Sequence, residues 1–150
     1  AAGIPDAGAT ARDPSLKPFA HGIVAGARLV RTASARYPQL DKANPAMFSE
    51  KIVTGLLREQ LGYEGVVITD DVNAKALADV PTGARAVRHV AAGGDIVLTG
   101  AASDADAMLK ALAAEARSDA GFAAKVDASV VRVLTLKERM GLLPCSTSKP

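Results

Sequence analysis

The sequence has 150 residues, of which 49% are hydrophobic and 23% charged, and its 18 basic and 16 acidic residues leave a formal charge of +2. This composition is typical of one globular domain with a real core, and it excludes a disordered chain, which carries fewer apolar residues and more net charge. Lys and Arg are scattered without a basic run, which argues against a nucleic-acid partner, and no apolar run reaches the roughly 18–20 residues of a membrane span.

The first part of the chain is predicted to hold two helices around a short strand. Asp13 precedes a proline as an N-cap does, so a helix is predicted near 14–25, and a short strand follows near 29–34. Residues 35–47 are predicted to form a loop because they contain two prolines and an asparagine. Ser49 is the predicted N-cap of a second helix, whose apolar positions recur with helical spacing.

Two later segments are typical of strands that are buried on both faces. Residues 65–70 form a nearly unbroken β-branched run, and residues 95–100 repeat the pattern. A helix is predicted near 82–92 between them, and Ser103 is the predicted cap of the next helix. A last helix is predicted near 122–140, with five candidate core residues: Val126, Val130, Val133, Leu134 and Leu136.

This order of elements predicts an α/β fold with a parallel sheet, because strands that alternate with helices are joined by right-handed crossovers. Three strands, near 29–34, 65–70 and 95–100, are few for a doubly wound domain. They are what three consecutive units of a (β/α)8 barrel would supply, since eight such units take about 250 residues.

Polar residues follow the predicted strands, at the edge where parallel α/β folds hold ligands and catalytic groups. These residues are Ser34, Arg36, Asp70, Asp71, Asn73, Thr99 and Ser103. Asp70 is the strongest candidate for a functional residue. Burying a carboxylate at the end of a strand costs free energy unless the group is paired, hydrated or needed for function. A turn cap is the alternative, and the residues alone leave the two equally open. Neighbouring strand side chains face opposite ways, so Asp70 and Asp71 are not expected to form one acid/base pair.

Residues 56–71 closely resemble the nucleophile region of glycoside hydrolase family 3, in its β-N-acetylglucosaminidase-like branch; they read LLREQLGYEGVVITDD. The resemblance extends over residues 12–143, through segments on both sides of this motif. Those segments are residues 16–19, 25–27, 37–41, 46–49, 86–87, 91–98 and 131–142.

The resemblance implies that residues 1–143 are the C-terminal half of a TIM-like barrel, with its sixth, seventh and eighth strands, and that residues 144–150 are a flexible tail. It implies that Asp70 is the nucleophile of a retaining glycosidase, which forms a glycosyl-enzyme that water then hydrolyses. Such a nucleophile has to be ionised, so cationic or hydrogen-bonding neighbours are expected. The implied substrate is a β-linked N-acetylglucosaminide or glucoside, and no cofactor or metal is implied.

Several positions depart from the family pattern. The family's Asp-x-His acid/base pair and its Lys-His motif do not occur in these 150 residues. Ser34 stands where relatives often carry His. Arg31 stands in a strand where the family is apolar, and it is expected to snorkel, to pair with a carboxylate, or to mark relaxed packing. Ser34, Arg36 and Asn73 are the candidate sugar-binding residues, and a turn-forming role is the alternative for Asn73.

The two histidines are predicted to lie on helix surfaces rather than in a site. Neither His21 nor His89 has a His, Cys or carboxylate at a convincing metal-ligand spacing. A receiver-like domain that holds Mg²⁺ with Asp70 and Asp71 fits poorly, because only one strand precedes the acidic pair.

Two functions from different classes stay open. The first is a glycosidase with Asp70 as nucleophile, whose acid/base segment lies before residue 1. The second is a non-catalytic half-barrel module, whose uncovered strand edges lead it to self-associate or to bind a partner. A nucleic-acid or membrane partner is expected in neither case. The compartment stays open between the bacterial cytoplasm and export.

Overall fold

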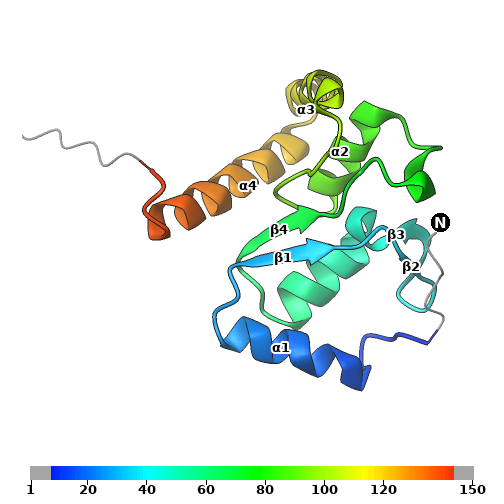
Figure 1. The fold of residues 1–150 in the computed structure, drawn as a ribbon, viewed down its shortest axis with the longest axis vertical. Coiled ribbons are helices and arrows are strands. Elements are labelled where there is room, and N and C mark those ends of the chain that lie inside the picture. Colours follow the sequence, from blue (N-terminus) through cyan, green and yellow to red (C-terminus); the bar gives the residue numbers. More distant parts are fainter. Residues whose placement is uncertain (1–7, 144–150) are drawn as a thin grey trace, which may run out of the picture.

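Helices and strands are mixed along the chain in the computed structural model, which describes residues 8–143 (Figure 1). The helices are α1 (Lys17–Val24), a π-helix η3 (Lys51–Gln60), α2 (Thr82–Ala91), α3 (Ala105–Ser118) and α4 (Ala120–Arg139). The strands are β1 (Leu29–Thr32), β2 (Arg36–Tyr37), β3 (Asp41–Pro45) and β4 (Val66–Thr69). Short 3-10 turns lie at Pro14–Leu16, Ala46–Phe48, Lys75–Leu77 and Ala102–Asp104. This order confirms the predicted α/β class, and the predicted tail at 144–150 lies outside the described residues.

The central sheet is short and parallel. β1 pairs with β4 along its whole length, and one further parallel bridge joins Ile68 to Ile96. The strand predicted at 95–100 is therefore wrong beyond that single bridge. Its ladder breaks because the Leu98 N–H donates to the Thr69 hydroxyl oxygen (2.8 Å) rather than to a strand carbonyl.

The segment predicted as a loop, residues 35–47, instead holds the antiparallel β2–β3 hairpin and a 3-10 turn. The buried Asp41 carboxylate organises it. This carboxylate accepts hydrogen bonds from the Ala43 N–H (2.9 Å), from the backbone and side-chain amides of Asn44 (3.3 and 3.0 Å) and from the Ser49 hydroxyl (2.8 Å). Burial opposes ionisation of Asp41, but these hydrogen bonds outweigh it and lower the pKa of the carboxyl to about 2.

The predicted helix caps have different outcomes. Asp13 accepts a hydrogen bond from the Ser15 N–H (2.8 Å), and the Ser49 hydroxyl accepts one from the Ile52 N–H (3.3 Å), as expected of caps. The Ser103 cap is wrong, because α3 follows Asp104 with no side-chain capping bond.

One face of the sheet is completely covered. Val67 and Thr69 of β4 have no exposed surface. Val53 and Leu57 of η3 pack with Val67, and Ile23 of α1 lies against the same cluster. A second hydrophobic cluster is formed by residues of α2 and α3 together with residues that precede η3 or follow β4. It comprises Met47, Phe48, Val72, Leu77, Ala86 and Met108. Strand alternation turns the side chains of Val66 and Ile68 to the other face, and Asp70, directly after β4, continues this alternation.

The core residues predicted for the last helix are wrong. The buried residues of α4 are Phe122 and Ser129. The predicted positions are exposed (Val130 and Leu134) or half-buried (Val126, Val133 and Leu136). Helical spacing identifies an apolar stripe, but it does not say whether a partner covers that stripe, and no described element covers most of this one.

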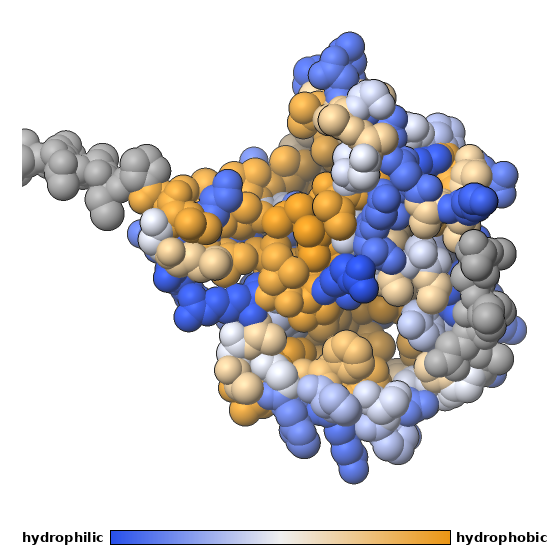
Figure 2. All heavy atoms as spheres, in the orientation of Figure 1, coloured by the Kyte–Doolittle hydropathy of each residue, from blue (hydrophilic) through white to orange (hydrophobic). Residues whose placement is uncertain are grey.

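An apolar surface is therefore left open, and Figure 2 shows it gathered over α4 and the neighbouring part of the sheet. Its large exposed side chains include Leu109, Val130 and Leu134. A groove of about 450 Å³ lies between α2, α3, α4 and residues 95–99. Within residues 8–143, no helix is both long and apolar enough to cross a membrane.

A buried charge cluster joins three elements at the amino end of the sheet. The fully buried Asp95 carboxylate accepts hydrogen bonds from Arg58 Nη2 (2.8 Å), Arg132 Nε (2.8 Å) and the Val67 N–H (2.7 Å). Arg58 comes from η3, Arg132 from α4 and Val67 from β4. Arg58 also donates to the Gly93 carbonyl from both Nε (2.9 Å) and Nη2 (2.8 Å). The Asp95 carboxylate therefore links η3, which precedes β4 in the sequence, and α4, which follows it, to the sheet.

We expect Asp95→Asn to lower the free energy of unfolding by about 3 kcal/mol, because it leaves two arginines beside a neutral amide in a buried site. Urea denaturation measures the change. The matched control is Asp127→Asn, at an exposed position of α4, which should change the free energy by less than about 0.5 kcal/mol. Equal stability of the two variants would contradict the structural role of Asp95.

We expect Asp41→Asn to remove part of the acid dependence of stability. The folded-state pKa of about 2 lies below the ordinary value of 3.8, so the ionised carboxylate contributes stability above pH 4, and that contribution is lost as pH falls through 2. It amounts to about 2 kcal/mol. Urea titrations at several pH values should show a difference between the two proteins that is constant above pH 4 and shrinks toward pH 2. A difference independent of pH would count against this role.

Candidate active site

Asp70 lies at the carboxyl end of the sheet, directly after β4. Its N–H donates to the Thr32 carbonyl at the end of β1 (2.8 Å), which fixes the Asp70 backbone to both strands. The Asp70 side chain is partly exposed, whereas Thr69 is completely buried. The Asp70 side chain keeps 38% of its surface exposed, so a ligand can reach the carboxylate.

Arg31 of β1 forms an ion pair with this carboxylate. Arg31 Nη1 lies 2.9 Å from Asp70 Oδ1, and the Arg31 side chain is 66% exposed. In the parallel register, Arg31 is opposite Ile68, two residues before Asp70. Of the three expectations for Arg31, pairing with a carboxylate is the one that the structure confirms.

The neighbouring Asp71 has different partners. Its Oδ1 accepts hydrogen bonds from the Asn73 N–H (2.9 Å) and the Gly100 N–H (3.1 Å). These two bonds lower the pKa of the Asp71 carboxyl. Asp71 therefore closes the turn after β4 and ties it to residue 100, while Asp70 stays available beside Arg31.

Asn73 is held within the same loop by both ends of its amide. Its Nδ2 donates to Thr99 Oγ1 (2.9 Å), and its Oδ1 accepts from Arg85 Nη1 (2.9 Å). Arg85 also donates to the carbonyls of Val72 (3.1 Å) and Val80 (2.7 Å), so it clamps the segment that follows Asp70. The sequence analysis missed Arg85, and the only signal for it is a cation early in the predicted helix near 82–92.

The other two candidate sugar-binding residues lie apart from this network. Ser34 is half-buried between β1 and β2, and Arg36 of β2 donates from Nη1 to the Ala43 carbonyl across the hairpin (2.7 Å). Within residues 8–143, no hydrogen bond or ion pair joins Ser34 or Arg36 to Asp70.

The two histidines differ. His21 is exposed on α1, as predicted. The surface prediction for His89 is wrong, because this side chain is completely buried: Nδ1 lies 2.9 Å from the Met47 carbonyl, and Nε2 has no hydrogen-bond partner among residues 8–143. Gly94 makes room for the ring, since a Cβ there would overlap it. Burial lowers the pKa of His89. The described part of the chain holds no cluster of three His, Cys, Asp or Glu side chains that could bind a metal.

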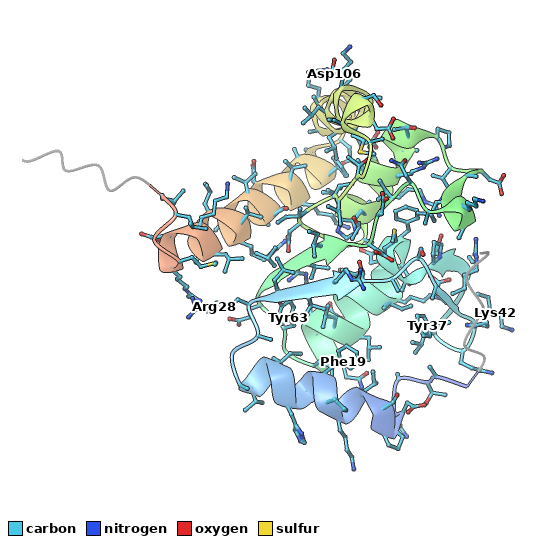
Figure 3. The ribbon with its side chains drawn as sticks, viewed as in Figure 1. Phe19, Arg28, Tyr37, Lys42, Tyr63 and Asp106 are labelled. Atoms are coloured by element: carbon cyan, nitrogen blue, oxygen red, sulfur yellow. The ribbon has the colours of Figure 1, made fainter. Side chains whose placement is uncertain are left out.

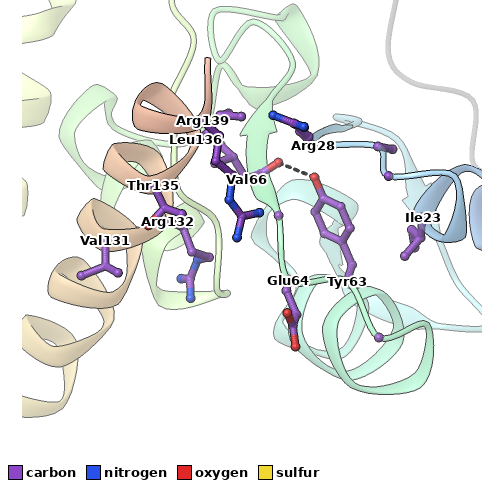
Figure 4. A pocket seen from close by; sticks show the side chains of 14 residues that line it. Ile23, Arg28, Tyr63, Glu64, Val66, Val131, Arg132, Thr135, Leu136 and Arg139 are labelled. Carbon is purple, nitrogen blue, oxygen red and sulfur yellow. Dashed lines mark hydrogen bonds between the residues drawn. The ribbon is translucent and has the colours of Figure 1, made fainter. Parts of the chain in front are cut away.

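A hollow of about 540 Å³ lies at the opposite end of the sheet from Asp70 (Figure 4). Its lining includes Arg28, Tyr63, Val66, Arg132 and Arg139. In Figure 3, Arg28 and Tyr63 mark this amino end of the strands, and the hairpin residues Tyr37 and Lys42 lie toward the other end. The Tyr63 hydroxyl donates to the Val66 carbonyl (3.0 Å), and burial raises the pKa of Tyr63 to about 12. This end of the sheet carries structural contacts and the exposed Glu64, and Asp70 is at the other end.

Comparison with known proteins agrees with the motif around Asp70. Residues 4–136 match the family described as the glycosyl hydrolase family 3 N terminal domain. A solved β-N-acetylhexosaminidase from Beutenbergia cavernae superposes with a TM-score of 0.87 and 46% sequence identity, over 92% of this chain and 41% of that one. A family 3 β-N-acetylglucosaminidase from a Paenibacillus species gives a TM-score of 0.81 and 32% identity, over 97% and 29%.

A curated β-hexosaminidase from Stenotrophomonas maltophilia is 41% identical over 90 residues, which are 58% of this chain and 26% of that protein. The chain thus spans less than half the length of the relatives that it matches. The family domain of these neighbours is TIM-barrel-like, which agrees with the parallel strands and the helices seen here. On the match over 4–136, the chain belongs to glycoside hydrolase family 3.

Proposed function

We propose that this chain is the C-terminal half of a family 3 barrel and that it supplies Asp70 as the nucleophile of a retaining β-N-acetylglucosaminidase. The observation that carries this proposal is the position of Asp70, an accessible carboxylate at the carboxyl end of β4 beside the cation of Arg31. β1, β4 and the segment at Ile96 would be the sixth, seventh and eighth strands. The neighbours with 46% and 32% identity are an N-acetylhexosaminidase and an N-acetylglucosaminidase, and they favour that substrate over a β-glucoside.

The chemistry takes two steps. The Asp70 carboxylate attacks the anomeric carbon while a general acid protonates the departing oxygen, and water then hydrolyses the glycosyl ester with the same group acting as base. The family's Asp-x-His pair is not among these 150 residues, and we propose that a segment outside them supplies the acid/base group.

The contacts of the candidate sugar-binding residues separate them. Ser34 follows β1 at the same edge of the sheet as Asp70, and no hydrogen bond engages its side chain within residues 8–143. Arg36 is engaged with Ala43, and Asn73 with Thr99 and Arg85, so a sugar contact from either would have to share or replace these bonds. Ser34 is therefore the strongest of the three.

We expect a ring-fluorinated N-acetylglucosaminyl fluoride to label Asp70 in the protein as its gene encodes it. The fluoride leaves without protonation, and the ring fluorine slows hydrolysis of the ester, so the intermediate accumulates. Mass spectrometry of the peptide that contains residues 66–73 locates the label. Asp70→Asn should abolish labelling and turnover, while Asp79→Asn, at an exposed position of the same loop, should leave both unchanged. A label on any other residue would overturn the assignment.

The open apolar surface favours a second candidate, a non-catalytic half-barrel that self-associates. Leu109, Val130 and Leu134 are exposed around the groove between α2, α3, α4 and residues 95–99. Covering such a surface and the free edges of the sheet is energetically favourable.

If this candidate holds, the 150-residue chain forms oligomers in analytical ultracentrifugation and does not hydrolyse a chromogenic β-N-acetylglucosaminide. A monomer that unfolds cooperatively would contradict self-association. Turnover by the chain alone, removed by Asp70→Asn, would contradict the non-catalytic function.

A further inference from the structure

Arg31 contacts one oxygen of Asp70 and leaves the other free. We infer that Arg31 is a positioning residue that selects Oδ2 of Asp70 as the attacking atom and speeds the second step of the reaction, the hydrolysis of the glycosyl ester. This inference rests on the proposed role of Asp70 as nucleophile.

The approach of Arg31 to the carboxylate is set by the strands. Arg31 is opposite Ile68, so its Cα lies about 7 Å nearer the amino end of the sheet than that of Asp70, at about 3.3 Å per residue. Its guanidinium therefore reaches Oδ1 from the amino end of the sheet, whereas ligands of parallel α/β folds arrive from the carboxyl ends of the strands. Arg31 can hold Asp70 without occupying the place of the sugar.

The two oxygens of Asp70 are not equivalent. Oδ1 accepts the bond from Arg31 Nη1 (2.9 Å), and within residues 8–143 Oδ2 accepts none. The Asp70 N–H is bonded to the Thr32 carbonyl, so the Asp70 backbone is held beside Arg31, and the bond from Arg31 decides which carboxylate oxygen stays free. Oδ2 is thus the oxygen with a free lone pair at the open edge.

No other described side chain forms an ion pair with Asp70. Asp71 is turned toward Asn73 and Gly100, and Arg85 toward Asn73 and two carbonyls. Within residues 8–143, Arg31 is therefore the cation that holds this carboxylate in an ion pair.

The charge on Asp70 changes during the reaction. In the first step the bond from Oδ2 to the anomeric carbon forms, the bond to the leaving oxygen breaks, and that oxygen takes a proton from the general acid. Oδ1 becomes the carbonyl oxygen of a neutral ester. In the second step the water oxygen bonds to the anomeric carbon, its proton goes to the general base, and the electron pair of the C–Oδ2 bond returns to the carboxylate.

A hydrogen bond from a guanidinium to a carboxylate is stronger than one to a neutral carbonyl. Arg31 therefore stabilises the free nucleophile, which does not favour the first step, and it stabilises the departing carboxylate, which favours the second. Loss of Arg31 should slow hydrolysis of the ester without slowing its formation. A residue that only stabilised the fold would not separate the two steps in this way.

The test uses the protein as its gene encodes it and dinitrophenyl β-N-acetylglucosaminide, whose leaving group needs no protonation. For Arg31→Met we expect kcat to fall about tenfold to a hundredfold, the effect of losing one charge-assisted hydrogen bond. KM should fall in parallel, so that kcat/KM does not decrease, and a burst of dinitrophenolate should appear in stopped flow. Arg31→Lys should restore part of kcat and shrink the burst.

Arg28→Met is the matched control, because Arg28 is an exposed arginine at the other end of the sheet, and it should show unchanged kcat and no new burst. An Arg31→Met protein with unchanged kcat, or with kcat/KM reduced as much as kcat, would overturn the inference. If Arg31→Met does not fold, judged by its thermal unfolding, Arg31→Lys decides: a smaller kcat with a burst supports the role, and unchanged kinetics overturn it.

The inference and the proposed function fail in different ways. If Asp70 is labelled by the fluoride probe but the Arg31 variants behave as the parent does, only the inferred role of Arg31 is contradicted. If the parent neither turns over the probe nor becomes labelled at Asp70, the proposed function falls, and the role of Arg31 falls with it.

Discussion

The parallel pairing of β1 with β4 is the constraint on which the site depends. It brings the carboxyl ends of two strands together, and the bond from the Asp70 N–H to the Thr32 carbonyl fixes the Asp70 backbone there. The same register places Arg31 two residues nearer the amino end of the sheet than Asp70, within reach of one carboxylate oxygen. If the register of β4 were shifted by one residue, the Asp70 side chain would point into the helix-covered core. It would then no longer lie beside Arg31.

The two ends of this sheet carry different kinds of charge. At the amino end, Asp95 is fully buried and bonded to Arg58, Arg132 and a backbone N–H, so its ion pairs hold helices to the sheet and reach no ligand. At the carboxyl end, Asp70 is accessible and holds a single cation. A buried and fully bonded carboxylate suits stability, and an accessible one with a free oxygen suits chemistry.

The sequence predicted the features that depend on neighbouring residues. The strand at 65–70, the helix near 82–92 and the placement of Asp70 at a strand end follow from local pattern, and the structure has them at 66–69, 82–91 and directly after β4. The errors come from contacts between distant residues. Leu98 bonds to the Thr69 hydroxyl, which ends the third strand, and Gly94 leaves space that lets α2 bury His89. No local pattern indicates which helix stripe lacks a partner, so the core of α4 was predicted wrongly.

The open apolar surface over α3 and α4 and the accessible edge at Asp70 both fit half of a larger barrel, and the chain covers 41% of one solved relative. The most direct measurement is a crystal structure of the gene-encoded protein after reaction with the fluorinated glycosyl fluoride. Asp70 as nucleophile predicts continuous density between Asp70 Oδ2 and the anomeric carbon, with Oδ1 still held by Arg31. A sugar joined to another side chain, or bound near Asp70 with no covalent bond after complete reaction, would contradict it.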